Sequence, residues 1–333
     1  MGKPIISVVV TAYNRREYLK YAVRSVINQT LDKGLYEMIV VKNFRDPEVD
    51  KLIEGNRGRV IEANDEPIGR YLARGIDEAE GEVISFLDDD DMYHSRKLER
   101  LYKVFNEDEN LDYYHHNIIP IDNYGKVIDF YVLNVHERIL IKNYYDISSV
   151  IKKYGDWLGF YMSAISIRKE LAMKIIRRIL PYVFYDQDII IYSLALSYSR
   201  SLLHEPYNLA FYRIHKENIS KIYGNNVKKM VKVRTLELLS YNLLIKILNF
   251  NDNLKDLKKI LTEKMIGNSY DNLLTIMTGL KYYIIRQSLM TLLSGIRNAS
   301  VNRIITSLLG IMYLINPYIG RKLVYRRYLK YFK

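Results

Sequence analysis

Short apolar runs rich in β-branched residues alternate with amphipathic helical patterns through the first third of this chain, and this alternation limits its fold more than any other feature. Ile5–Thr11 is apolar on both faces, which is typical of a central parallel strand. Arg15–Gln29 places its apolar residues along one helical stripe. Strands that alternate with helices predict an α/β fold with a mixed, mainly parallel sheet and helices on both faces.

The same alternation continues to about residue 105. Met38–Val41 and Val83–Leu87 have the pattern of buried strands, and Arg59–Glu62 that of a shorter one. Helices are expected from Pro67 to Gly81, with proline near the start and glycine past the end, and from about Ser95 to Phe105. Ligands of such sheets bind at the carboxyl ends of the strands, so functional residues are expected there.

Four consecutive aspartates, Asp88 to Asp91, directly follow the buried strand Val83–Leu87. A solvated acidic loop is the simplest interpretation of a charge run. Carboxylates at the end of a buried strand also suit a divalent cation, Mg²⁺ or Mn²⁺, which would in turn bind a diphosphate. No GxGxxG opens the first helix and no GxxxxGK occurs in the sequence, which favours a metal-held nucleotide over a glycine-cradled one.

The composition excludes several kinds of site. Cysteine is absent, so disulfides, thiol nucleophiles and zinc ribbons are excluded, and six histidines argue against a His-rich metal site. Met1 leads into KPIISVVV without a basic region, a long apolar region and a small-residue cleavage site. The start therefore predicts a buried strand of a cytoplasmic protein.

Charge is distributed unevenly along the chain. Residues 1–220 hold 30 Lys and Arg against 33 Asp and Glu, whereas residues 221–333 hold 20 against 5 and have no acidic residue after Asp271. We therefore expect a catalytic domain over 1–220 and a basic, amphipathic, helical region over 221–333. A nucleic-acid partner is not expected, because the first two-thirds of the chain is net acidic.

Several motifs, taken in their order along residues 4–220, resemble those of the family 2 glycosyltransferases of the GT-A fold. The first strand ends in a Thr-x-Tyr-Asn turn, and the next helix carries a Ser-x-x-x-Gln pattern. A Gly-x-x-x-Ala-x-Gly-Glu helix end precedes an Asp-x-Asp motif, YDQDIIIYSLALSYS resembles the helix that begins at the catalytic base, and a Tyr-Arg-x-His-x-x-x-x-Ser element closes the domain. These positions are Thr11, Tyr13, Asn14, Ser25, Gln29, Gly75, Ala79, Gly81, Glu82, Asp88, Asp90, Tyr212, Arg213, His215 and Ser220.

The resemblance implies a metal-dependent, inverting glycosyltransferase that moves a sugar from a nucleotide-sugar donor to a glycan or lipid-linked acceptor. It implies a metal site at Asp88, Asp90 and His215. The implied nucleotide-sugar contacts are Thr11, Tyr13, Asn14, Asn43, Arg70, Arg74, Asp88, Asp89 and Arg213. His215 follows Arg213 by two residues, so in an extended segment both side chains face the same way.

Three points stay open on the sequence. The catalytic base is Asp186 or Asp188, with Asp186 favoured by the motif and Asp112 a weaker candidate, although either of the first two can instead cap a helix. Arg70 and Arg74 share a helix face, and either can approach a phosphate. Lys42 and Asn43 stand where the family usually has paired aspartates, which supports an alternative, a nucleotide-binding scaffold without turnover.

The C-terminal region contains an uncharged, mostly apolar run, Ile304–Gly320, of 17 residues between Arg303 and Arg321. As a helix it would extend about 25 Å, whereas the hydrocarbon core of a bilayer is about 30 Å thick. Cations and tyrosines beside a short apolar run favour an interfacial anchor on anionic lipid. We therefore expect peripheral attachment to the inner face of the cell membrane, with a helical subdomain that keeps a solvated basic face as the alternative.

Overall fold

The computed structural model describes residues 3–64, 67–142, 144–215, 227–248 and 301–328, together with scattered helical positions between 258 and 296. The described residues divide into two compact units, one that ends at His215 and one that begins at Val227. The predicted domain boundary near residue 220 stays a prediction, because residues 216–226 lie outside the described ranges.

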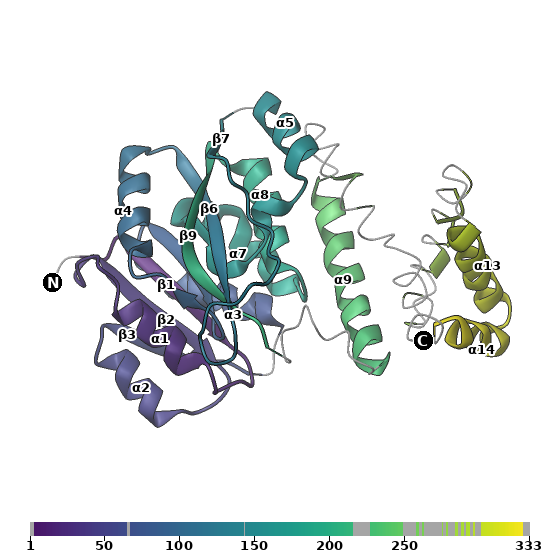
Figure 1. Ribbon diagram of the computed structural model, residues 1–333, viewed down its shortest axis with the longest axis horizontal. Coiled ribbons are helices and arrows are strands. Elements are labelled where there is room, and N and C mark those ends of the chain that lie inside the picture. Colours follow the sequence, from purple (N-terminus) through teal and green to yellow (C-terminus); the bar gives the residue numbers. More distant parts are fainter. Residues whose placement is uncertain are drawn as a thin grey trace. The chain divides into compact units, whose positions relative to one another are not determined.

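Four parallel strands form one half of the sheet in the first unit (Figure 1). They are β1 (Ile6–Ala12), β2 (Tyr36–Lys42), β3 (Gly58–Glu62) and β4 (Val83–Asp88), in the order β3-β2-β1-β4. The register places Thr11 of β1 opposite Val41 on one side and Asp88 on the other. The carboxyl ends of the central strands therefore meet at one edge of the sheet, as the sequence predicted.

The other half of the sheet is mixed. Its strands are β5 (Met92–Tyr93), β6 (Leu111–Ile121), β7 (Ile139–Ile141), β8 (Ile165–Arg168) and β9 (Ser201–Arg213). Strand β8 is antiparallel to both β4 and β6, while β9 runs parallel to β6 and antiparallel to β5 and β7. The resulting order, β3-β2-β1-β4-β8-β6-β9-β5, is consistent with the mixed sheet that was predicted.

Helices cover both faces of this sheet. Ile6, Val8 and Val10 of β1 share one buried cluster with α1 (Leu19–Ile27) and α4 (Lys97–Glu107). On the opposite face, α3 (Ile68–Glu78) lies so close to β1 that a Cβ on Gly75 would come within 2.2 Å of Val9 Cγ1. Gly75 is therefore needed for close packing of helix on strand.

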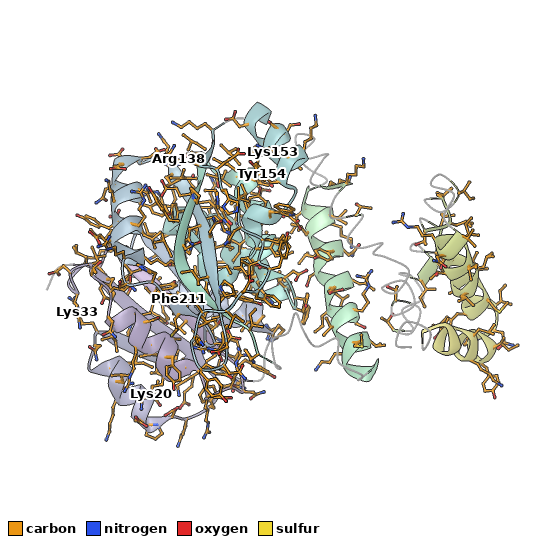
Figure 2. The ribbon with its side chains drawn as sticks, in the orientation of Figure 1. Lys20, Lys33, Arg138, Lys153, Tyr154 and Phe211 are labelled. Atoms are coloured by element: carbon orange, nitrogen blue, oxygen red, sulfur yellow. The ribbon has the colours of Figure 1, made fainter. Side chains whose placement is uncertain are left out.

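The remaining helices of the first unit are shorter or follow the parallel strands. They are α2 (Pro47–Glu54), α5 (Tyr144–Tyr154), α6 (Lys169–Leu171), α7 (Arg177–Ile179) and α8 (Gln187–Tyr198), with short 3₁₀ or π turns at Trp157–Gly159, Met162–Ala164, Ala172–Ile176 and Leu180–Tyr182. Lys153 and Tyr154 at the end of α5, both labelled in Figure 2, donate 2.8 Å hydrogen bonds to Glu137, two residues before β7.

The second unit is helical over its described residues. It contains α9 (Val227–Leu248), as the sequence pattern predicted, α13 (Val301–Ile315) and α14 (Pro317–Tyr328). The apolar run Ile304–Gly320 is thus divided, because the Asn316 side chain accepts hydrogen bonds from the first N–H groups of α14. In the parts of the chain that the structure describes, no helix has the length and apolar character needed to cross a membrane.

Candidate active site

The aspartate run lies at the carboxyl end of β4, beside the end of β1. The carboxylates of Asp88, Asp90 and Asp91 each place one oxygen within 4.8 Å of the others, an arrangement that can hold a metal ion. Asp88 is half-buried, while Asp89, Asp90 and Asp91 are buried. The structure therefore groups Asp91 with the two aspartates that the sequence motif singled out.

A serine from another part of the chain fixes the geometry of this cluster. Ser163 Oγ donates a 2.7 Å hydrogen bond to Asp91 Oδ2 and accepts one of 3.1 Å from the backbone N–H of Asp88. The backbone carbonyl of Ser163 accepts a 2.6 Å hydrogen bond from the buried Lys97 ammonium. Sequence reasoning missed Ser163 and Lys97, since no local pattern marks a residue that reaches the site from a distant segment.

The Ser-x-x-x-Gln motif on α1 holds the chain that leaves the aspartate run. Ser25 Oγ accepts a 2.9 Å hydrogen bond from the N–H of Tyr93 in β5. Gln29 donates to the carbonyl of His94 and accepts from the N–H of Leu98, both at 2.9 Å. These bonds explain why α1 carries a Ser and a Gln at this spacing, because the two side chains anchor the segment after the aspartate run to the helix.

Two cationic or imidazole groups contact Asp90. Arg15 Nη1 lies 2.9 Å from Asp90 Oδ2, and Arg15 also donates a hydrogen bond to Asp89. His215 Nε2 lies 2.9 Å from the same Asp90 oxygen and 3.2 Å from Arg15 Nη1. The structure thus brings His215 to the predicted metal site. Arg15 was missed, although its place directly after the Tyr-Asn turn is a signal that could have found it.

Asp88, Asp89 and Asp91 hold protons more tightly than ordinary carboxyl groups do. Burial, then the charges of Asp91 and the other aspartates, raises the pKa of Asp88 well above its usual value. Burial and the charge of Asp90 raise the pKa of Asp89 to about 7, against the opposing effect of Arg15. The same two causes raise the pKa of Asp91 to about 8. Carboxyl groups that stay protonated near neutral pH are suited to bind a divalent cation, which would take the place of the protons.

The predicted nucleotide-binding turn is held by a pair of amides. Asn14 has φ 55° and donates its backbone N–H to Asn43 Oδ1 at 2.9 Å, while Asn43 Nδ2 donates to Asn14 Oδ1 at 2.8 Å. The Tyr13 ring is exposed and packs edge-on against Tyr71, with ring centroids 5.9 Å apart. Thr11, Tyr13, Asn14 and Asn43 lie at or directly after the carboxyl ends of β1 and β2.

The predicted arginines lie in different places. Arg74 donates a 3.2 Å hydrogen bond to the carbonyl of Glu62 at the end of β3, three strands from β4, and Arg70 is exposed on α3. Arg213 is buried, and its guanidinium donates to the carbonyls of Asp90, Asp122 and Asn123 at 2.8 to 3.0 Å. Arg213 thus fastens the acidic loop to β9 and to the turn after β6.

The candidate catalytic bases lie at the start of α8. Asp188 Oδ2 accepts a 3.1 Å hydrogen bond from the N–H of Tyr161, and its charge contributes to the raised pKa of Asp88. Asp186 precedes the helix with φ 53° and makes no side-chain capping bond. Tyr161 also has a positive φ, 67°. Non-glycine residues held in this conformation are strained and concentrate at functional sites.

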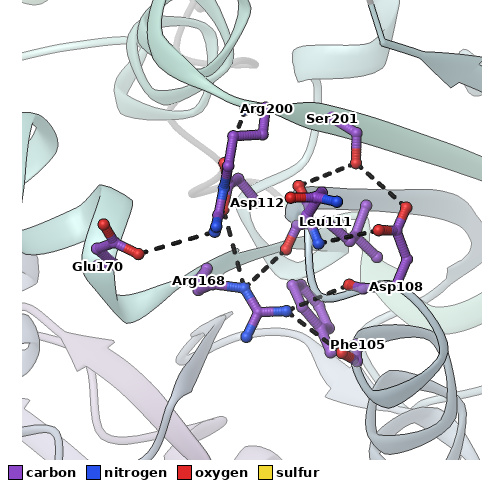
Figure 3. A network of polar contacts seen from close by, with 9 residues as sticks. Phe105, Asp108, Leu111, Asp112, Arg168, Glu170, Arg200 and Ser201 are labelled. Carbon is purple, nitrogen blue, oxygen red and sulfur yellow. Dashed lines mark hydrogen bonds and ion pairs between the residues drawn. The ribbon is translucent and has the colours of Figure 1, made fainter.

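Asp112 belongs to a structural network at the opposite edge of the sheet (Figure 3). Its carboxylate accepts from the Arg200 guanidinium at 2.6 and 3.0 Å and from the Arg200 backbone at 2.8 Å. Arg168, whose Nε lies 3.8 Å from Asp112, pairs in register with Val83 at the amino end of β4. The structure therefore separates Asp112 from the aspartate run.

Comparisons with known proteins agree on the family and the fold. The model of glycosyl transferase family 2 matches residues 7–165. Uncharacterized glycosyltransferases of Nostoc sp. and Methanocaldococcus jannaschii are 31% and 26% identical over 64% and 57% of this chain. The chain covers 66% and 62% of these two relatives, less than two thirds of their own lengths.

Two solved structures have a similar fold at low sequence identity. The S. aureus TarS fragment 1-349 matches with a TM-score of 0.56 and 14% identity, covering 94% of this chain and 92% of that one. The mannosyltransferase PcManGT of Pyrobaculum calidifontis, solved with GDP-Man and Mn²⁺, matches with a TM-score of 0.51 and 12% identity, covering 98% of this chain and 88% of that one. Residues 7–165 are therefore a family 2 glycosyltransferase domain, and the predicted GT-A fold is confirmed.

Proposed function

We propose that this chain is a metal-dependent, inverting glycosyltransferase that moves a sugar from a nucleotide-sugar donor to a glycan or lipid-linked acceptor. The observation that carries the proposal is the group of carboxylates from Asp88, Asp90 and Asp91, gathered at the carboxyl end of β4 within a glycosyltransferase family domain. The names of the relatives support the reaction class. The structures of TarS with UDP-GlcNAc and of PcManGT with GDP-Man support a nucleotide-sugar donor.

Asp88, Asp90 and Asp91, whose oxygens lie within 4.8 Å of one another, would hold Mg²⁺ or Mn²⁺. We keep the predicted ligand His215 in this proposal because its Nε2 lies 2.9 Å from Asp90 Oδ2. The bound cation would neutralise charge on the departing diphosphate. Arg15 supplies further positive charge at the same place, since its guanidinium touches both Asp89 and Asp90. The buried Oδ2 atom of Asp89 has no hydrogen-bond partner among the described residues, which leaves one acceptor for a hydroxyl of the donor.

Asp186 or Asp188 would take the proton of the acceptor hydroxyl as that oxygen attacks the anomeric carbon. Such an attack, on the face opposite the leaving diphosphate, gives inversion. Asp188 is near Asp88 and is oriented by the N–H of Tyr161, whereas Asp186 is held in a strained conformation at the start of the same helix. Both carboxylates are only partly exposed, as a base that works in a cleft requires.

A nucleotide-binding scaffold of the same fold is the second candidate. Its support is the end of β2, where Lys42 is buried against Asp50 and the next residue, Asn43, is bonded to Asn14, in place of an acidic acceptor for a nucleotide base. A scaffold would bind the donor without turnover. An assay that measures donor binding and sugar transfer on the same preparation separates the two candidates.

The location of the protein is part of the proposal. We place it in the cytoplasm, peripheral on the inner face of the cell membrane, with anionic lipid as the partner of the basic region and no nucleic acid. The support is the balance of 20 Lys and Arg against 5 Asp and Glu over residues 221–333. Several of the cations and aromatic residues behind this prediction, including Arg297 and residues 329–333, lie outside the described residues.

Thermal shift with a panel of sugar nucleotides, each with Mn²⁺, Mg²⁺ or chelator, tests the donor and the metal together. We expect one donor to stabilise the protein only with a divalent metal. Asp90→Asn should lose this stabilisation and all transfer, while Asp129→Asn, a matched change at an exposed aspartate, should keep both. Equal transfer with excess chelator and with Mn²⁺ would contradict metal dependence.

A further inference from the structure

Helix α13 exposes most of its large apolar side chains and buries small and polar ones, which is unusual for a helix in water. It buries Thr306, Ser307, Gly310 and Tyr313. It exposes its large apolar side chains instead, which we call the apolar face of α13: Val301, Ile305, Leu308, Ile311, Met312 and Ile315. Residues 301, 305, 308, 312 and 315 recur every three or four positions and so lie along one side of the helix, with Ile311 three positions after Leu308 at its border. A soluble amphipathic helix has the opposite arrangement, with its apolar stripe inside.

Most of the described positions between 284 and 296 repeat this arrangement, although Ile284 is buried in one apolar cluster with Tyr313 and Val324. Ser288 and Thr291 are buried, whereas Ile285, Leu289, Leu293 and Ile296 are exposed at spacings of four, four and three. The two polar sides meet, because Ser307 Oγ donates a 2.5 Å hydrogen bond to the carbonyl of Ser288. The described positions of 284–296 and helix α13 thus meet through hydroxyl groups as well as a small apolar cluster, and both turn a row of large apolar side chains outward.

This packing is typical of helices in lipid. Small residues let helix backbones approach, and hydroxyl groups bond across the interface, when the surroundings are as apolar as leucine. The close approach is visible where α13 meets α14, since a Cβ on Gly320 would come within 2.3 Å of Tyr313 Cα. In water, exposed apolar area of this extent marks an interaction surface.

We infer that the apolar face of α13 inserts into the interfacial region of an anionic bilayer, with the helix lying along the membrane. Helix α13 has 15 residues and so extends about 22 Å, too short to cross a hydrocarbon core of about 30 Å. Lys322 and Tyr318 are exposed just beyond it, where a cation and an amphipathic ring suit the headgroup layer.

Charge complementarity favours lipid over a second copy of the chain. Residues 272–333 contain no acidic residue, so a second copy would bring together surfaces of like charge, whereas anionic headgroups are opposite in charge. The inference makes the proposed membrane association specific to one helix face. It does not depend on sugar transfer, so vesicle binding and donor binding can fail separately.

Site-specific labelling of the full chain tests the inference directly, because the protein has no cysteine. A nitroxide attached to Leu308→Cys should move to about 5–10 Å below the phosphate level of phosphatidylglycerol-containing vesicles. The same label on Tyr124→Cys, a highly exposed position of the first unit, should stay in water. A label at position 308 that remains in water while the chain binds these vesicles overturns the inference.

Substitutions on full-length protein provide the second test. Leu308→Gln with Met312→Gln should weaken partition onto the same vesicles by at least about tenfold, because two apolar side chains are lost from the inserted face. The matched pair Val127→Gln and Met173→Gln, two exposed apolar residues of the first unit, should change partition by less than about twofold. Unchanged binding in the first pair overturns the inference. Immobilisation of the label at position 308 without vesicles, together with a dimer in sedimentation, would instead assign the face to a second copy.

Discussion

Single side chains determine the chemistry of the acidic loop. Asp90 accepts from Arg15 and His215 on one oxygen, while both oxygens of Asp91 are bonded to Ser163 and to the backbone of Arg213. Asp90 and Asp91 are adjacent in sequence yet have different surroundings. A run of identical residues therefore does not act as a run of equivalent ligands.

The pH dependence of stability follows from these raised pKa values. Asp89 and Asp91, with pKa values of about 7 and about 8, keep protons that the unfolded chain has already released. Their contribution to the free energy of unfolding is therefore present at lower pH and is lost as pH rises through 7 to 8. We expect these two carboxyl groups to lower the free energy of unfolding, measured by urea titration with chelator, by about 1–3 kcal/mol between pH 6.5 and 8.5.

Two controls make this prediction specific. Mn²⁺ should remove most of the decrease, because a bound cation replaces the protons. The buried imidazoles of His115 and His116, whose pKa values are lowered by burial, act in the opposite sense and below their ordinary value of about 6.5. Most of their effect therefore falls below pH 6.5. The buried Lys97, whose pKa is lowered well below its ordinary value by burial, opposes the decrease within the window, so the contribution of the aspartates is read from the difference between the curves with chelator and with Mn²⁺. A pH dependence between 6.5 and 8.5 that is the same with Mn²⁺ and with chelator would contradict the assigned shifts.

The identity of the base is also decided by single residues. Asp186→Asn should lower turnover by at least about 10²-fold, the usual contribution of general base catalysis, while donor affinity in the thermal-shift assay survives. Asp188→Asn is the paired comparison, because it conserves shape and keeps an acceptor for the N–H of Tyr161. If Asp188→Asn is inactive and Asp186→Asn is close to normal, the base is Asp188.

At the scale of elements, the site depends on contacts between segments far apart in sequence. The acidic loop is bonded to α1 through Ser25 and Gln29, to the turn before β8 through Ser163, and to β9 through Arg213. Hydrogen bonds from three separate segments thus hold the loop in place. They keep a cluster of mutually repelling carboxylates in one arrangement.

Ser163→Ala tests this support. The change leaves the N–H of Asp88 without its partner and removes the hydrogen bond that lowers the pKa of Asp91. We expect a loss of about 1–3 kcal/mol in the free energy of unfolding and weaker binding of Mn²⁺ by titration calorimetry. Ser166→Ala, which removes a buried hydroxyl bonded only to Ser85 in the described contacts, is the control and should leave Mn²⁺ affinity unchanged. Equal metal affinity in both variants would refute a supporting role for Ser163.

Local pattern predicted the parallel half of the sheet and missed much of the rest. The strand Ile6–Ala12 and helix α9 follow from apolar periodicity, and the aspartate run follows from its place after a buried strand. Helix α2 was not predicted, because its eight residues carry too short an apolar stripe, although Asp46 caps it and Pro47 begins it. The pairing of β8 between β4 and β6, which brings Ser163 to the site, is a long-range choice that no local spacing encodes.

For the whole molecule, the two units have opposite electrostatic character. The first 220 residues are slightly acidic in balance, and the remaining 113 carry a large excess of cations. The family resemblance led to the prediction of sugar transfer for the first part. The excess of Lys and Arg over Asp and Glu led to the prediction of an anionic partner for the second. The outward apolar face of α13 could not be predicted, because apolar residues at helical spacing are equally expected for a helix that packs inward.

This division predicts how salt acts on the protein. Raising NaCl from about 0.05 to 0.5 M shortens the Debye length from roughly 14 to 4 Å, so the attraction of the basic region to anionic vesicles should weaken by at least about tenfold. The weak partition onto neutral phosphatidylcholine vesicles, which depends on the apolar face of α13, should change little, since apolar burial is not screened. Vesicle sedimentation at both salt concentrations measures the two contributions on the same full-length protein. Equal binding to neutral and anionic vesicles at low salt would mean that the 20 cations of this region serve something other than lipid.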